Sequence, residues 1–87
     1  MSNYDIDDAH YYLDKVNTLL IAKGRGYVYS IRDEDPDNDV YSLSYGVMRT
    51  DGNGKRRYYR KDYVFINIGS EELCHCIMGM FHALAMP

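Results

Sequence analysis

The chain has 87 residues, which suffice for one small domain spanning residues 1–87 but not for a large core, because a domain of this size buries only about 60 to 65 per cent of its unfolded surface. It carries ten tyrosines, no tryptophan and a formal net charge of −3 at pH 7, with the acids concentrated in residues 1–39 and a basic excess in residues 40–87. No secretory signal pattern opens the chain and no apolar run approaches the roughly 18 residues of a membrane span, so we expect a cytoplasmic protein without a membrane segment.

The first helix is predicted by apolar residues that recur at spacings of three and four, the pattern of one helix face. Aspartates in its first turn and Lys23 in its last suit the helix dipole, and Gly24 supplies the left-handed residue that often ends a helix. The apolar residues of this face are Ile6, Ala9, Leu13, Val16 and Leu20.

Three strands are predicted next, as an antiparallel meander. Residues 27–32 and 40–50 are rich in β-branched and aromatic side chains, and an acidic loop from Asp33 to Asp39 separates them. The four residues 51–54, Asp-Gly-Asn-Gly, are typical of a tight hairpin turn, because glycine and asparagine tolerate positive φ angles. Residues 55–68 then return as the third strand.

A second helix is predicted from Ser70, which we expect to be its N-cap, with Glu71 and Glu72 at the positive end of the helix dipole. From Leu73 to Met86 the segment is apolar nearly all round, which is typical of a helix buried on more than one side. The face expected to contact the sheet consists of Leu73, Ile77, Met80 and Leu84. The face expected to pack on the first helix, or to form a homodimer interface, consists of Cys74, Met78, Phe81 and Ala85. The predicted fold is therefore α+β, with element order α-β-β-β-α and a three-stranded antiparallel meander packed against two helices.

Side-chain alternation predicts which strand residues face the helices. The predicted core face consists of Tyr41, Leu43, Tyr45, Val47, Tyr58, Val64 and Ile66. The predicted outer face places Tyr59, Lys61, Tyr63 and Phe65 beside Ser42, Ser44, Gly46 and Met48. Exposed aromatic residues among small ones are typical of an interaction surface. Cross-strand packing over Gly46 would explain the same pattern without a partner.

The stretch from Lys55 to Lys61, KRRYYRK, begins at the predicted hairpin tip. Cations hold phosphates and aromatic rings stack on bases, so this strand is a candidate nucleic-acid surface. The element order resembles that of double-stranded RNA-binding domains, but those domains carry a lysine cluster where this chain has Ser70, Glu71 and Glu72. The acidic balance of the chain also argues against tight sequence-independent binding. The candidate basic and aromatic residues are Lys55, Arg56, Arg57, Tyr59, Arg60, Lys61, Tyr63 and Phe65.

The acidic loop has three interpretations. Its alternating acids suggest a calcium loop, but Asn38 stands where an EF-hand requires glycine and Ser44 where it requires glutamate, so we expect no calcium. A solvated loop is the common outcome for such charge runs. The third interpretation is a surface that imitates the phosphates of DNA and occupies a basic channel of another protein. The residues in question are Asp33, Glu34, Asp35, Asp37 and Asp39.

No catalytic or metal-ligating pattern is recognisable. His75 and His82 share a helix face but are about 10 Å apart along the axis, too far for one zinc ion. Cys74 and Cys76 point in divergent directions on the helix, so we expect reduced, structural thiols. The chain has no Gly-rich phosphate loop, paired-carboxylate pattern or activated serine. We therefore expect a protein that is not an enzyme and that has no cofactor and no metal.

In size, acidity, lack of catalytic motifs and helix-flanked three-stranded sheet, the whole chain resembles small phage-encoded inhibitors of the anti-CRISPR type. This resemblance implies docking on a protein partner, such as a nucleic-acid-bound effector complex, with the acidic loop as the DNA mimic. The alternative is a nucleic-acid-binding module that uses the basic third strand and the hairpin tip. We expect the first function and keep the second as its rival.

Overall fold

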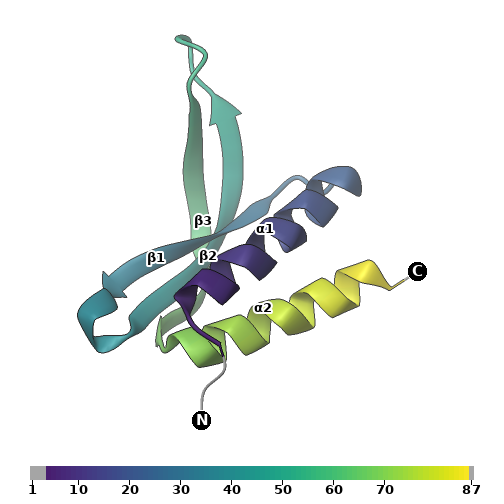
Figure 1. Cartoon of the computed structure of the whole chain (residues 1–87). Helices are drawn as coiled ribbons and strands as arrows, with labels where there is room; N and C mark the ends of the chain where they lie inside the picture. The colour runs from purple at the N-terminus through teal and green to yellow at the C-terminus, as the bar shows by residue number, and fades with distance from the viewer. Residues whose placement is uncertain (1–3, 87) are drawn as a thin grey trace.

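The structure, a computed structural model, describes residues 4–86 and has the α+β architecture that the sequence predicts. The sheet is antiparallel in the order β1-β2-β3. Both helices lie on one side of it, and the β2–β3 hairpin extends well beyond them (Figure 1). We call residues 46–60 the hairpin arm. The elements are α1 (Ile6–Ala22), β1 (Val28–Asp35), a 3₁₀ turn (Pro36–Asn38), β2 (Val40–Thr50), β3 (Arg56–Ile68) and α2 (Ser70–Ala85).

Helix α1 begins with the predicted aspartates, but Lys23, predicted in its last turn, is its C-cap, one residue beyond Ala22. Asp5 is the N-cap: its side chain accepts a hydrogen bond from the Asp8 backbone N–H, and the Asp8 side chain accepts one from the Asp5 backbone N–H. This reciprocal pair satisfies two N–H groups that a helix start leaves free. Beyond the C-terminus, Gly24 has the left-handed φ of 70°. The predicted apolar face is confirmed, because Ala9, Leu13, Val16 and Leu20 are all buried.

The core lies between the two helices and the base of the sheet. Leu43 and Tyr41 of β2 are buried beneath the helices, as predicted. They pack with the apolar face of α1 and with Leu73, Cys74 and Ile77 of α2. Burying apolar surface of this kind contributes roughly 25 cal/mol per Å², so these few side chains supply much of the stability of a small domain. Within residues 4–86, neither helix is long and apolar enough to cross a membrane.

An asparagine fixes α1 to the edge of the sheet. The Asn17 amide donates to the Tyr29 carbonyl at 2.9 Å and accepts from the Tyr29 N–H at 2.8 Å. Because β1 is an edge strand, these backbone groups would otherwise face outward without a strand partner. The side chain of Asn17 therefore takes the place of a fourth strand at this one position.

The predicted faces of β3 are wrong over much of its length. The β2–β3 register shifts between Tyr41 and Leu43, between Leu43 and Ser44, and between Tyr45 and Gly46. Each such irregularity places extra residues on one strand and so alters the alternation of its side chains. Among the consequences, Val64 and Ile66, predicted to be in the core, are 39% and 58% exposed.

The same shifts rearrange the aromatic residues. Tyr58, predicted to face the helices, pairs with Met48 and its hydroxyl lies 2.9 Å from the Ser44 hydroxyl, on the opposite face. Tyr59 pairs with Val47, and Phe65 pairs with Leu43, which faces the helices. The predicted platform of four residues on one face is therefore divided between two faces.

Two boundaries near the acidic loop also differ from the prediction. Asp33 and Asp35 are part of β1, paired with Tyr41 and Val40, so the loop is shorter than expected. The N-cap of α2 is Gly69, which has no side chain that could cap the helix, and not Ser70. Instead, both carboxylate oxygens of Asp39 accept from the Ser70 N–H, at 3.3 and 3.2 Å. A carboxylate from the turn between β1 and β2 thus takes the capping role that the sequence assigns to Ser70.

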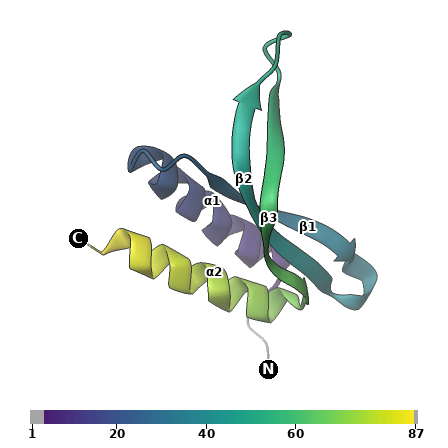
Figure 2. The same ribbon diagram turned by 180° about the vertical axis from the view of Figure 1, so that it is seen from behind.

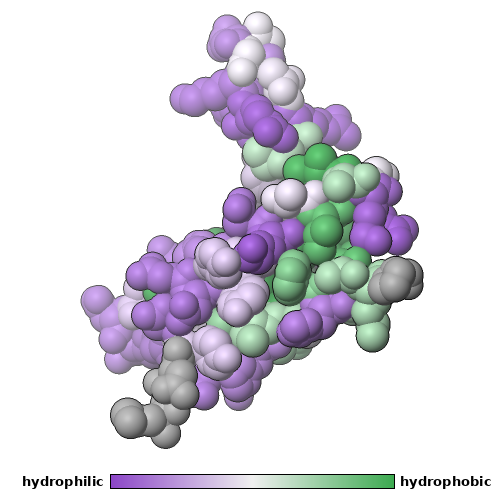
Figure 3. All heavy atoms as spheres, turned by 45° about the vertical axis from the view of Figure 1, so that its right-hand side comes forward, coloured by the Kyte–Doolittle hydropathy of each residue, from purple (hydrophilic) through white to green (hydrophobic). Residues whose placement is uncertain are grey.

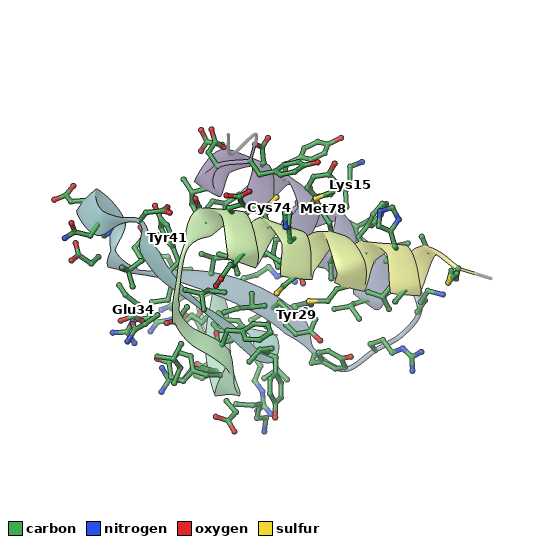
Figure 4. The ribbon with its side chains drawn as sticks, turned by 90° about the horizontal axis from the view of Figure 1, so that it is seen from below. Lys15, Tyr29, Glu34, Tyr41, Cys74 and Met78 are labelled. Atoms are coloured by element: carbon green, nitrogen blue, oxygen red, sulfur yellow. The ribbon has the colours of Figure 1, made fainter. Side chains whose placement is uncertain are left out.

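Helix α2 packs mainly on α1. Cys74 is fully buried, and Met78 and Phe81 are half-buried against the core, with the Phe81 ring 6.3 Å from that of Tyr12. Figure 4 shows Cys74 and Met78 on the side of α2 that faces α1. Of the four residues considered for a homodimer interface, only Ala85 is exposed. Cys74 in particular is enclosed within the chain and cannot contact a second subunit.

Candidate functional site

Negative charge collects at one end of the molecule. There the N-terminal ends of α1 and α2 lie beside the turn between β1 and β2 (Figure 1). This surface, which we call the acidic end, is wider than the predicted acidic loop because it includes the first turns of both helices. Its residues are Asp5, Asp7, Asp8, Asp33, Glu34, Asp35, Asp37, Asp39, Glu71 and Glu72.

The environment of Tyr41 shows that these segments lie close to one another. Its ring is buried beneath the acidic end. Burial, followed by the negative charges of Asp39, Asp33 and Asp7, raises the pKa of the Tyr41 hydroxyl above its ordinary value. Carboxylates from α1, from β1 and from the turn therefore act on one phenol, so three separate segments of the chain contribute to a single negative surface.

The raised pKa gives a prediction for alkaline pH. Folding favours the neutral phenol, so this contribution is fully present below the ordinary pKa of about 10 and is lost as pH rises through the higher folded value. We expect Tyr41→Phe to lose less stability than the wild type between about pH 9 and pH 11. Urea unfolding midpoints across that range measure the difference. Tyr11→Phe, at an exposed tyrosine, is the control and should follow the wild type. If the wild type and Tyr41→Phe lost the same amount of stability between about pH 9 and pH 11, the prediction would be contradicted.

The predicted acidic residues divide into two groups. Asp39 caps α2, Glu34 forms an ion pair of 3.2 Å with the Nε of Arg32, and Asp35 accepts from the Asn38 amide at 2.8 Å. Within residues 4–86, the exposed side chains of Asp33 and Asp37 have no hydrogen bond or ion pair. Asp33 and Asp37 are therefore the two members of the predicted set whose carboxylates are free to meet a partner.

The hairpin arm carries the positive charge. Arg49 lies opposite Arg57, and such like-charged pairs destabilise a hairpin. Asp51 offsets this repulsion, because its carboxylate accepts from the N–H groups of Asn53 and Lys55 and from the Nε of Arg57 at 3.2 Å. The N–H groups of Lys55 and Asn53, and then Arg57, hold the pKa of the Asp51 carboxyl below its usual value.

The arm is hydrophilic at its end and hydrophobic where it meets the body of the molecule (Figure 3). Lys55, Arg56 and Arg57 are exposed near the tip, as the sequence predicts, and Tyr59 is 49% exposed. Because paired residues share a face, Arg57 and Tyr59 lie with Arg49 and Val47 on one side, while Arg56 lies on the other. Cations thus project from both sides of the arm.

Figure 2 shows the molecule from behind, with the sheet in front of α1. The sheet face opposite the helices carries a second group of cations, at the base of the arm. Arg32 Nη1 donates to the Tyr63 hydroxyl at 3.0 Å, and Arg60 Nη1 donates to the same oxygen. The Arg60 guanidinium also lies over the Tyr63 ring, 4.3 Å from its centre. Arg32, Arg60 and Tyr63 line a shallow groove of about 300 Å³, which we call the arginine groove. Its other lining residues are Ser30, Ile31, Ser44 and Tyr58.

The structure thus separates the predicted basic-aromatic set. Arg60 and Tyr63 lie in this groove, whereas Lys61 is exposed at a register shift and Phe65 lies on the helix-facing side. Sequence reasoning missed Arg32, which belongs to β1 and reaches Tyr63 across β2. Strand alternation alone does not decide between the two faces for Arg32; its pairing with Ser42 is what places it on the face of Ser44.

The two cysteines are both free thiols, Cys74 buried and Cys76 partly exposed. Within the part of the chain that the structure describes, no three His, Cys, Asp or Glu side chains gather as metal ligands would. Burial, and then the charges of Asp8 and Asp5, raise the pKa of the Cys74 thiol. Since the thiolate is the reactive form, this residue is held in its inert state.

The molecule therefore offers three polar surfaces: the acidic end, the hairpin arm and the arginine groove. Comparisons of the chain with protein-family models, with curated proteins and with solved structures found no match.

Proposed function

We propose that this chain is a non-enzymatic binding protein that acts in the cytoplasm. It docks through its acidic end on a basic surface of a protein partner and thereby inhibits or modulates a complex that handles nucleic acid. The observation that carries the proposal is the gathering of three acids around Tyr41: Asp7 from α1, Asp33 from β1 and Asp39 from the β1–β2 turn. The inhibitory role follows from the resemblance to small phage inhibitors of the anti-CRISPR type.

Local structure supports this role because it holds the acidic end in place. The reciprocal bonds of Asp5 and Asp8 fix the start of α1, and Asp39 ties the turn to the start of α2. Backbone segments that are already positioned lose little conformational entropy when the carboxylates they carry bind a partner, which favours affinity. Carboxylates on such segments also present negative charge to a channel that is built for phosphates, and such complementarity accelerates association at low salt.

The test is charge reversal at the two free carboxylates, as Asp33→Lys with Asp37→Lys. Because neither side chain has a structural bond within residues 4–86, the fold should be kept. A partner is first isolated by affinity capture from the native host after nuclease treatment, and its affinity is then measured with both proteins purified. We expect the double variant to bind at least about tenfold more weakly, which corresponds to about 1.4 kcal/mol.

The matched control is Arg49→Glu with Lys55→Glu, which reverses two exposed charges on the hairpin arm. It should keep the affinity of the wild type. Wild-type affinity in the Asp33 and Asp37 variant, together with a loss in the arm variant, would show that the acidic end is not the docking surface.

A second candidate function is nucleic-acid binding by the hairpin arm. The observation that favours it is the projection of the arm from the body with exposed cations on both sides. A two-stranded ribbon of this kind can enter the major groove of DNA. This function predicts a gel shift that weakens with salt and is lost in Arg56→Ala with Arg57→Ala. The absence of any shift at low salt would exclude it.

A further inference from the structure

We infer that the groove on the uncovered sheet face is an anion site, in which Arg32 and Arg60 together hold a phosphate group. This inference is independent of the docking function proposed for the acidic end. The groove contains Arg60 and Tyr63 but neither of the free carboxylates, Asp33 and Asp37.

The geometry that points to an anion is the convergence of two guanidinium groups on one oxygen. Arg32 and Arg60 both donate to the Tyr63 hydroxyl. Two guanidinium groups that donate to the same oxygen lie close enough to repel each other. The neutral phenol of Tyr63 compensates this repulsion only in part. An anionic oxygen in place of the hydroxyl attracts both groups and forms stronger, charge-assisted hydrogen bonds.

Within residues 4–86, the carboxylate of Glu34 competes with an anion for one of the two arginines, Arg32. Glu34 forms an ion pair with the Nε of Arg32, which partly neutralises that side chain. Arg60 has no carboxylate partner within residues 4–86, and its guanidinium is held by stacking on the Tyr63 ring. One arginine is therefore both unpaired and positioned in advance, which lowers the entropy lost on binding.

Phosphate is the anion that suits this arrangement. The planar fork of arginine matches phosphate oxygens, and two forks can hold different oxygens of the same group. The Ser44 hydroxyl donates to the Ser30 carbonyl at 3.5 Å, and the Tyr58 hydroxyl, 2.9 Å from that of Ser44, lines the same groove and can turn its proton to a further oxygen. At about 300 Å³ the groove is at the lower limit for small-ligand pockets and is open to solvent. It can therefore accept a phosphate on a free nucleotide or on a single nucleic-acid strand.

The test uses three probes: inorganic phosphate, adenosine monophosphate and an eight-residue oligothymidine. Each is titrated into the ¹⁵N-labelled chain, and backbone amide shifts are followed. We expect all three to shift the amides of Ser30, Ser44 and Tyr63. Arg32→Gln and Arg60→Gln should each weaken the response at least about fivefold. Arg49→Gln, at an exposed arginine outside the groove, should leave it unchanged.

Two further variants distinguish a binding site from a purely structural network. Glu34→Gln removes the competing carboxylate and should tighten phosphate binding about two- to fivefold, a gain that misfolding cannot produce. Tyr63→Phe removes the hydroxyl that occupies both arginines and should keep or improve binding.

The probes also separate the two sources of phosphate. Tighter binding of the oligonucleotide than of the mononucleotide supports a nucleic-acid strand, and the reverse supports a free nucleotide. Amide shifts outside the groove only, or wild-type affinity in both arginine variants, would overturn the inference.

Discussion

Gly46→Ala is expected to destabilise the fold by about 3 kcal/mol, because the backbone of β3 leaves no room for a side chain at this position. A Cβ atom on Gly46 would overlap the Tyr59 carbonyl and lie 2.8 Å from the Arg60 Cα. These are backbone atoms, which cannot rotate away as a flexible side chain can. Overpacking in well-packed sites commonly costs about 1 to 3 kcal/mol, and a clash with backbone belongs at the upper end.

Urea unfolding of the wild type and the variant measures this loss. Gly52→Ala is the matched control, since a Cβ there has no neighbour within 4 Å, and its effect should stay within about 0.5 kcal/mol. Because Gly46 lies at the start of the hairpin arm, a variant that folds at all should show altered amide shifts in residues 46–60. A wild-type midpoint for Gly46→Ala would contradict the close approach of the two strands.

Asp39→Ala is expected to destabilise the fold by about 2 to 3 kcal/mol through two separate losses. The first is the carboxylate that accepts from the Ser70 N–H at the start of α2, and loss of such a cap costs about 1 kcal/mol. The second is conformational: Asp39 has a φ of 59°, and most residues other than glycine, asparagine and aspartate pay roughly 1 to 2 kcal/mol there.

Two variants at this turn separate these losses in the same urea assay. Asp39→Asn keeps a side-chain acceptor and tolerates the left-handed conformation, so it should cost less than about 1 kcal/mol. Asp37→Ala removes a neighbouring exposed carboxylate without a bond within residues 4–86 and should be nearly neutral. If Asp39→Ala proved as stable as Asp37→Ala, the hydrogen bonds between Asp39 and the start of α2 would contribute nothing to the free energy of unfolding.

The features predicted correctly from the sequence depend on neighbouring residues alone. The apolar spacing of α1, the left-handed Gly24 and the hairpin residues 51–54 are signals that do not need the rest of the fold. The bounds of β2, residues 40–50, were likewise predicted as the structure has them. In each case the loop or turn residues beside the element mark where it ends.

The features that could not be predicted depend on contacts between distant segments. The register shifts of β3 arise from its pairing with β2, and a run such as residues 61–66 carries no glycine or proline to announce them. The capping of α2 by Asp39 joins residues that are far apart in the chain. For this reason Asp39, predicted as part of the docking loop, has a structural role as the cap of α2.

The candidate surfaces show the same limit. The sequence indicates an acidic loop, but only the fold brings the starts of both helices beside it. The arginine groove joins β1 to β3, so neither strand alone predicts it. Side chains that meet across a middle strand are recognisable only once the register of all three strands is known.

The amide of Asn17 has a consequence for aggregation. Continuous edge-to-edge growth of a sheet requires every chain to offer two free edge strands, so that each edge can pair with a further copy. In this molecule the β1 edge is obstructed at Tyr29 by a side chain that already pairs with its backbone. A single asparagine thereby hinders edge-to-edge pairing at the start of β1, where a strand of another copy would have to displace it.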